Sequence, residues 1–297
     1  MPVRSAELAD SARARGVAGK LNVAGVETAY WHYPSKVTGA PSIVFIHGYR
    51  GNHHGLEAIA GALSDFDLYI PDLPGFGQSG EFVGAHSINH YAGWVKALVG
   101  ALQLDQPVLL GHSFGTIVSA AATAQGAKVS KVVLVNPVSA PALKGPRALM
   151  TLVAQGFHAL AARLPERVGN GILRSFVFVR GMSVVMTKSR DGKLRRWVHA
   201  QHDSNFNNYT SLRVATEGYA ASISNNVGEY AELIKQPTLL IAGQKDDITS
   251  VAAQREVRER FADAKLVVLQ GVGHLTHYES PDAVAAEIRE FLGTPAR

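Results

Sequence analysis

The sequence predicts an α/β protein with a mostly parallel central sheet, flanking helices and an inserted helical segment. Short apolar runs, typical of buried strands, alternate with amphipathic helical patterns along most of the chain. That alternation stops in the middle of the chain and resumes before its end. With 297 residues, 46% of them hydrophobic, the chain has enough apolar surface for the core of one large domain.

The first half of the chain contains the regular part of the pattern. Residues 20–33 alternate apolar and polar side chains around Gly25, which predicts an antiparallel hairpin. Buried strands are expected at residues 42–46, 68–70, 108–110 and 131–135. The helices between them are expected at residues 55–63, 88–104 and 114–125. This order implies parallel strands joined by right-handed crossovers.

Residues 141–230 lack a clear buried strand and predict a mostly helical cap inserted into the sheet domain. Within it we expect a helix at 147–163, an apolar stretch at 172–186 and a polar helical segment around Trp197. After the cap, strands are expected at 237–243 and 265–269, with helices at 250–261 and after Ser280. Ser280 is the expected N-cap of the last helix and Pro281 its first residue. The sheet domain therefore comprises residues 1–140 and 231–297.

Composition excludes several classes of protein. With no Cys, the chain has no disulfides, thiolate metal ligands or cysteine nucleophile. The net charge is +5, but the basic residues form no run and no nucleic-acid-binding module is recognisable, so we expect no nucleic-acid partner. The charge is uneven, because residues 141–231 hold 12 Lys or Arg against 5 Asp or Glu. That segment carries +7, which leaves −2 for the rest of the chain.

The sequence also bears on location. Residues 1–20 mix charged and small side chains and contain no apolar core of the length that a signal peptide needs, so we expect a cytoplasmic protein. The two most apolar stretches of the cap, 148–162 and 172–186, are each interrupted by polar or charged residues. We therefore expect no transmembrane segment.

The stretch around Ser113 predicts a nucleophile. An apolar run leads into Gly111-His112-Ser113-Phe114-Gly115, and an apolar helical pattern follows. A serine hydroxyl is a weak nucleophile, so it must stand clear of the backbone, beside a base and near N–H groups that receive an oxyanion. A strand that turns abruptly into a helix with Ser113 at the turn meets these needs, and glycines on both sides permit so tight a turn.

Five short motifs, in order along the chain, carry a resemblance to a known family. They are His47-Gly48 after a buried strand, Asp72-Leu73-Pro74-Gly75-Phe76-Gly77-Gln78-Ser79, the glycine–serine motif at 111–115, Gly243 with Asp246, and Gly273-His274. Together they resemble the α/β-hydrolase fold serine hydrolases over nearly the whole chain. The resemblance implies that fold, no cofactor, and a small-molecule acyl substrate.

The resemblance also implies the site residues. By position, Ser113 is the nucleophile, His274 the general base and Asp246 the acid that orients it. All three follow predicted parallel strands at their carboxyl ends, where ligands of open α/β sheets bind. A histidine suits the role because its ordinary pKa is near neutrality.

Some neighbours compete for these roles. Asp247 is the alternative to Asp246. The resemblance favours Asp246, because in the family pattern the acid stands three positions after the glycine that ends the strand. Asn136 occupies the place where some family members have their acid, which again favours Asp246. His277 is the neighbour most easily confused with His274, and we expect its side chain to be solvated, with a contact to substrate as the alternative.

The resemblance implies an oxyanion hole formed by the backbone N–H groups of Tyr49 and Phe114. The side chains of Tyr49 and Phe114 are expected either to wall the pocket or to pack in the core. Arg50 is expected to brace its loop by pairing with an acid, with a substrate carboxylate as the alternative partner. His47, His53 and His54 do not match a metal-binding spacing, so no metal site is expected.

The expected reaction is hydrolysis of a carboxylic ester, thioester or lactone through an acyl-serine intermediate. The same triad also serves C–C bond hydrolases, perhydrolases and acyltransferases, and a catalytically idle receptor can carry it too. For the cap, one hypothesis is that its apolar residues seal it onto the core while basic residues face solvent. The other hypothesis is that the apolar residues line an acyl pocket and that arginines stand at the mouth of this pocket. The apolar residues in question are Leu149, Leu152, Phe157, Phe176 and Phe178, and the arginines are Arg174, Arg180, Arg195 and Arg196.

Overall fold

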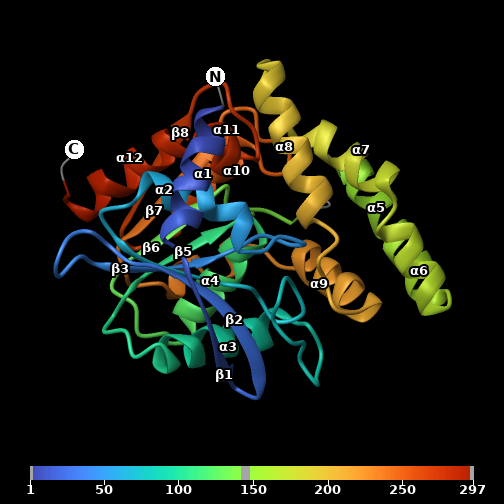
Figure 1. Ribbon diagram of the computed structural model, residues 1–297, viewed down its shortest axis with the longest axis horizontal. Helices are drawn as coiled ribbons and strands as arrows, with labels where there is room; N and C mark the ends of the chain where they lie inside the picture. Colours follow the sequence, from blue (N-terminus) through green and yellow to red (C-terminus); the bar gives the residue numbers. More distant parts are fainter. Residues whose placement is uncertain (1–2, 142–147, 295–297) are drawn as a thin grey trace.

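The computed structural model describes residues 3–141 and 148–294, and its centre is an eight-stranded sheet in the order β1-β2-β4-β3-β5-β6-β7-β8 (Figure 1). The strands β1 (Val17–Val23) and β2 (Val26–Tyr33) form the predicted antiparallel hairpin, and β2 pairs antiparallel with β4 (Asp67–Pro71). All other pairings are parallel. The remaining strands are β3 (Ser42–Ile46), β5 (Val108–His112), β6 (Val132–Val135), β7 (Thr238–Gly243) and β8 (Ala264–Leu269).

Helices cover both faces of this sheet. One face is covered by α1 (Arg4–Arg15), α2 (Glu57–Ala62) and α12 (Pro281–Leu292), whose apolar side chains form one core cluster. The other face is covered by α3 (Ile88–Ala101), α4 (Phe114–Ala124) and α10 (Val251–Arg258). Short helical turns at η1 (His53–Leu56) and α11 (Thr276–Glu279) precede α2 and α12. The prediction of a mostly parallel α/β fold is confirmed.

Two details at the chain ends differ from expectation. Helix α1 was not predicted, although Ser5, Leu8, Ala9 and Ala12 are buried at helical spacing. A charged side chain attaches α1 to α2, because Arg13 donates a hydrogen bond to Glu57. At the other end, α12 begins at Pro281 as predicted, but the side chain of Ser280 makes no capping hydrogen bond.

In the described part of the chain between β6 and β7, the structure has five α-helices, and we call them the inserted helices. They are α5 (Ala148–Arg163), α6 (Glu166–Leu173), α7 (Phe176–Met186), α8 (Gly192–Asn205) and α9 (Leu212–Ser224). The predicted start of the first helix at Arg147 lies outside the described residues. Two short 3₁₀ turns, Val227–Glu229 and Ala231–Leu233, lead back to β7. Met186 of α7 lines the same cavity as Ser113, so these helices lie at the carboxyl ends of the parallel strands.

Both hypotheses for the apolar side chains of this segment are wrong at four positions. Leu149, Leu152, Phe157 and Phe176 are between 46% and 75% exposed, so they neither seal the helices onto the core nor line an inner pocket. Phe178 is half-buried and packs edge-on against the ring of His158. Among the described residues, no helix combines the length and the apolar character needed to cross a bilayer.

Candidate active site

Ser113 is the single residue between strand β5 and helix α4, as the sequence predicted. Its φ of 52° is positive, a conformation that costs a non-glycine residue about 1–3 kcal/mol. The glycines beside it permit close contacts. A Cβ at Gly111 would lie 2.3 Å from the carbonyl oxygen of Gly115, and a Cβ at Gly115 would lie 2.1 Å from that of Ile46. The turn therefore excludes a side chain at both positions.

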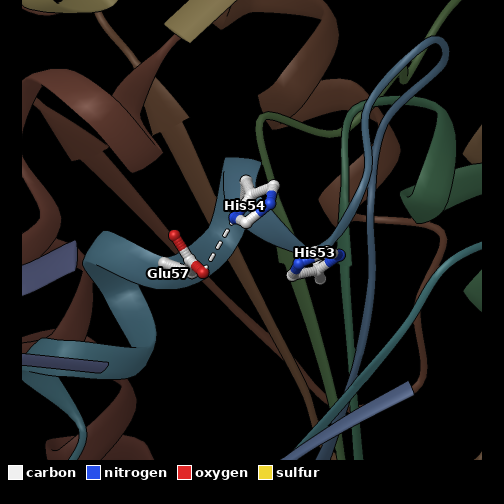
Figure 2. A group of neighbouring side chains, drawn as sticks. All are labelled: His53, His54 and Glu57. Atoms are coloured by element: carbon white, nitrogen blue, oxygen red, sulfur yellow. Dashed lines mark hydrogen bonds and ion pairs between the residues drawn. The ribbon is translucent and has the colours of Figure 1, made fainter. Parts of the chain in front are cut away.

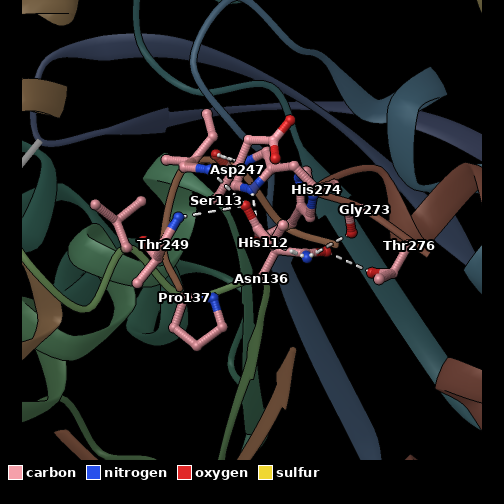
Figure 3. A network of polar contacts seen from close by, with 12 residues as sticks. His112, Ser113, Asn136, Pro137, Asp247, Thr249, Gly273, His274 and Thr276 are labelled. Carbon is pink, nitrogen blue, oxygen red and sulfur yellow. Dashed lines mark hydrogen bonds and ion pairs between the residues drawn. The ribbon is translucent and has the colours of Figure 1, made fainter. Parts of the chain in front are cut away.

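The structure brings Ser113, His274 and Asp246 into one hydrogen-bonded row. His274 Nε2 lies 2.7 Å from Ser113 Oγ (Figure 3). On the other side of the ring, His274 Nδ1 lies 2.8 Å from Asp246 Oδ2. Because a carboxylate only accepts hydrogen bonds, Nδ1 carries the proton and Nε2 is free to accept one from the serine hydroxyl. The row has the order that proton transfer from Ser113 to His274 requires.

Asp246 is buried and held from several sides. Its Oδ1 accepts a hydrogen bond from the backbone N–H of Ile248 at 2.8 Å, and its Oδ2 accepts one from Asn136 Nδ2 at 3.0 Å. Burial alone raises the pKa of Asp246, but the attraction of His274 and these hydrogen bonds outweigh burial, so the pKa is lowered. The carboxylate is therefore ionised at neutral pH.

Asn136 supports this arrangement from the end of β6. Besides Asp246, its amide donates to the carbonyl of Gly273 at 3.1 Å, and its oxygen accepts a hydrogen bond from Thr276 (Figure 3). It thus connects the acid to the segment that carries His274. The sequence showed only that Asn136 stands where some family members have their acid. The hydrogen bonds of its amide form only when the loops have folded, so no pattern in the sequence predicted them.

Asp247 takes a different partner. Its carboxylate forms an ion pair with Lys188, which follows α7, and it lines a cavity beside His274. The structure therefore places Asp246 rather than Asp247 against His274.

The loop after β3 lies directly against Ser113. A Cβ at Gly48 would lie 3.3 Å from Ser113 Cβ, so the absence of a side chain lets the loop approach. The imidazole of His47 holds this loop in place. Its Nε2 accepts a hydrogen bond from the backbone N–H of Leu73 at 2.8 Å, so the ring proton is on Nδ1, which donates to the carbonyl of Gly48. Burial lowers the pKa of His47, which keeps this imidazole neutral.

The side chains on either side of Ser113 have packing roles. Phe114 is buried against Tyr91 in the core, and its N–H lies in the first turn of α4, where N–H groups have no partner in their own helix. The hydroxyl of Tyr49 donates a hydrogen bond to the carbonyl of Ala215 in α9 at 2.6 Å. Phe114 therefore packs in the core, as one expectation had it, whereas the half-buried Tyr49 both packs on α9 and lines the cavity beside Ser113.

Arg50 braces its loop, but not through an acid. Its guanidinium donates to the carbonyls of Phe206 and Leu173, at 2.9 and 3.0 Å, and to Asn207 Oδ1 at 2.7 Å. The side chain is 1% exposed, and this burial lowers its pKa. All three partners belong to the inserted segment, so Arg50 ties that segment to the loop beside Ser113.

A cavity of about 250 Å³ extends from His274 between the inserted helices. Most of its lining is apolar. The lining residues are Thr151, Ala154, Gly181, Met182, Val185, Met186, Lys188, Tyr219, Asp247, Ile248 and His274. None of the four arginines proposed for the mouth of an acyl pocket is among them. Arg180 instead pairs with Asp203, and Arg174 donates to the carbonyl of Tyr209.

A second cavity of about 60 Å³ lies beside Ser113 and the loop at Gly48. His112, His202 and His277 contribute to its wall. The expectation that His277 is solvated is wrong: its side chain is 5% exposed, and its ring centre lies 3.9 Å from that of His112. The turn α11 points it inward, which the spacing from His274 did not reveal.

Asp72, His53 and His54 line neither of these two cavities. The buried carboxylate of Asp72 accepts from the N–H groups of His53 and Gln78, and so holds the 72–79 loop in shape. His53, His54 and Glu57 approach one another closely enough to consider a metal (Figure 2). However, Glu57 is already bonded to His54 Nδ1 and to Arg13, and a guanidinium on the carboxylate disfavours a cation there.

Comparison with known proteins identifies the family. The family model described as alpha/beta hydrolase fold matches residues 41–281, which is most of the chain. The chain belongs to the alpha/beta hydrolase fold family. The segment matched by the family model includes Ser113, Asp246, His274 and all five inserted helices.

Several proteins named as a hydrolase, a lipase or a lactonase are similar to this chain over most of its length. It is 26% identical to an uncharacterized hydrolase, YugF, of Bacillus subtilis, over 92% of this chain and 97% of that protein. It is 24% identical to Lipase 3 of a Moraxella species, covering 91% of this chain and 83% of the lipase. The crystal structure of an enol-lactonase from Burkholderia xenovorans superposes with a TM-score of 0.74 at 22% identity, over 93% of this chain and 100% of the other. At that identity the superposition shows the fold alone.

Proposed function

We propose that this protein is a serine hydrolase that cleaves a carboxylic ester, including a thioester or lactone, with Ser113, His274 and Asp246 as its triad. The observation that carries the proposal is the continuous row of hydrogen bonds from Ser113 Oγ through His274 to a buried, ionised Asp246. Relatives named as esterases and lipases support the same class of reaction.

In the proposed reaction His274 Nε2 takes the proton of Ser113 as Oγ attacks the carbonyl carbon. The carbonyl π electrons move onto oxygen, and the N–H groups of Tyr49 and Phe114 stabilise the resulting oxyanion. When this intermediate collapses, His274 returns the proton to the leaving alcohol, and the acyl group stays on Ser113. Water, activated by His274, then releases the acid and restores the serine. Asp246 stabilises the imidazolium in both halves.

We further propose that the inserted helices, residues 141–230, act as a cap that selects the substrate over a core of residues 1–140 and 231–297. Support comes from the apolar cavity of about 250 Å³, which is lined by α5, α7 and α9 and reaches His274. An apolar substituent of the ester fits that lining. The proposed chemistry needs no cofactor, because the side chains and backbone of the protein supply every group that it uses. We also propose that the protein is cytoplasmic.

A panel of p-nitrophenyl esters, run beside a serine-directed phosphonate probe, tests the proposal. Ester turnover together with labelling is the expected result. Labelling without turnover of any ester or lactone would indicate another reaction of the same triad, such as C–C bond hydrolysis. Neither labelling nor turnover would contradict the proposal and favour a ligand receptor.

A further inference from the structure

The smaller cavity beside Ser113 has an unusual wall. Among the described residues, five histidines line this cavity of about 60 Å³. Besides His47 and His274, they are His112 at the end of β5, His202 in α8 and His277 in α11, which come from separate parts of the chain. We call it the histidine cavity. Its lining also includes Ser113 and His274, so a group bound here touches the reacting atoms.

Two of these imidazoles have a hydrogen-bonding atom left over. Among the described residues, His202 Nε2 and His277 Nδ1 are buried and have no hydrogen-bond partner. The other nitrogen of His202, Nδ1, lies 2.7 Å from Ser183 Oγ, which fixes the ring so that Nε2 is its free atom. A buried polar atom without a partner costs about 1–3 kcal/mol. A ligand that hydrogen-bonds to these atoms recovers that free energy.

The chemistry of the wall selects the kind of ligand. None of the described Lys, Arg, Asp or Glu residues lines the cavity. Burial lowers the pKa of His112 and of His202 to about 3, so these imidazoles are neutral at pH 7. A neutral imidazole offers one donor and one acceptor, which suits a hydroxyl group better than a carboxylate. The volume corresponds to about two waters, or a group of two or three heavy atoms.

We propose that the histidine cavity binds a small hydroxyl-bearing end of the ester substrate, through His202 Nε2 and His277 Nδ1. The inference rests on the proposed function. It makes the substrate asymmetric, with a small hydroxylated end here and a larger apolar end in the cavity of about 250 Å³. The hydroxylated end belongs either to the alcohol or to the acyl part, and the experiment separates the two.

Two matched pairs of esters test this proposal. One compares the 2-hydroxyethyl and propyl esters of octanoic acid, and the other compares octyl glycolate with octyl propionate. In one of the two pairs, we expect kcat/KM to be roughly tenfold higher for the hydroxylated ester than for its alkyl counterpart. The hydroxyl group forms a hydrogen bond with a buried imidazole nitrogen, which the alkyl ester leaves without a partner. His202→Leu should remove that preference.

His199→Leu is the matched control, because His199 lies on the same helix and contacts the same Ser183 hydroxyl but is not part of the cavity wall. It should keep the preference. His277→Leu serves as the second test variant if His202→Leu does not fold. No preference in either pair, or a preference that survives both cavity substitutions, would overturn the proposal. Absence of turnover for all four esters would instead count against the proposed function.

A second inference rests on the outer surface of the inserted helices. Of the 13 large apolar side chains that are exposed in the described residues, nine lie between residues 149 and 184. On α5 they recur on one side of the helix, and no charged residue occurs between Ala148 and Ala162. Helices α5, α6 and α7 lie at the outer edge of the molecule, away from the hairpin β1–β2 (Figure 1). We call this surface the apolar face. Its residues are Leu149, Leu152, Val153, Phe157, Leu160, Val168, Phe176, Val177 and Val184.

Basic residues flank the apolar face. Residues 148–200 hold nine Lys or Arg and two Asp or Glu. Arg163 and Arg167 are exposed at the junction of α5 and α6, and Arg190, Lys193 and Arg196 are exposed after α7. A contact between two copies through this face would bring two strongly positive surfaces together. Anionic lipid headgroups instead complement the charge while the apolar side chains enter the interface.

We infer that the apolar face docks on an anionic lipid surface. Vesicles of phosphatidylcholine mixed with phosphatidylglycerol should bind the full chain, pure phosphatidylcholine vesicles should bind it at least tenfold more weakly, and salt should weaken the binding. The paired substitution Phe176→Ser and Val177→Ser should reduce binding more than tenfold, because both side chains lose their contact with the interface.

Val83→Ser is the control, since Val83 is fully exposed but lies outside the inserted helices. It should bind like the parent chain. Equal binding by the paired variant, or no binding to the mixed vesicles, would overturn the inference. So would a dimer in sedimentation velocity that the paired variant abolishes, because the face would then be covered by a second copy. None of these readouts depends on catalysis.

Discussion

At the scale of single residues, the site depends on hydrogen bonds that fix which atom of His274 carries its proton. Asp246 accepts from Nδ1, and Asn136 holds the carboxylate from the opposite side. The neighbouring carboxylate of Asp247 is turned toward Lys188. Two adjacent acids therefore have distinct partners, and substitution separates them.

Asp246→Asn should lower kcat by about three to four orders of magnitude, because an amide favours the wrong imidazole tautomer. Asp247→Asn breaks the ion pair with Lys188 and leaves the contact between Asp246 and His274 in place, so it should keep kcat within about tenfold of the parent, the scale of a partly exposed ion pair. Steady-state kinetics on one p-nitrophenyl ester compares the two. If Asp247→Asn lost most of its kcat while Asp246→Asn kept it, the acid of the triad would be Asp247 and our assignment would be one position too early.

At the scale of elements, the turn from β5 to α4 brings backbone atoms into contact that side chains normally keep apart. Gly111 contacts Gly115, and Gly115 contacts the carbonyl of Ile46 in the neighbouring strand β3. This packing places the start of α4 beside the loop after β3, so the same glycines serve stability and the candidate site.

Gly115→Ala should destabilise the protein by about 1–3 kcal/mol or more, because the new Cβ would lie 2.1 Å from the Ile46 carbonyl oxygen. Gly100→Ala is the control: it lies in α3 with no atom within 4 Å of the added Cβ. It should be neutral or stabilising by up to about 1 kcal/mol, since alanine favours a helix. Urea unfolding measures both. Equal stability of the parent and Gly115→Ala would refute the account of this turn.

At the scale of the whole molecule, the sheet gathers residues 113, 246 and 274 at one edge although they are far apart in the chain. The strand and helix pattern made this edge predictable, because parallel strands present their carboxyl ends together. The loops that follow each strand limit the choice of residues, and the resemblance of their motifs to those of the family then singled out Ser113, Asp246 and His274 as candidates.

The inserted helices were harder to predict. The helical spacing of their apolar residues is visible in the sequence. This spacing does not say which side of a helix faces the core, and Leu149 and Phe176 in fact face solvent. The burial of His277 and the cavity beside His112 arise from contacts between α8, α11 and β5, which are distant in the chain. Such contacts depend on the packing of whole elements, so local pattern does not reveal them.

The central claim is that Ser113 forms the covalent intermediate, and phosphonate labelling followed by intact mass tests it most directly. The parent chain should gain one adduct, whereas Ser113→Ala should gain none and should lose ester turnover by several orders of magnitude while keeping its circular dichroism spectrum. Undiminished labelling of Ser113→Ala would contradict the account.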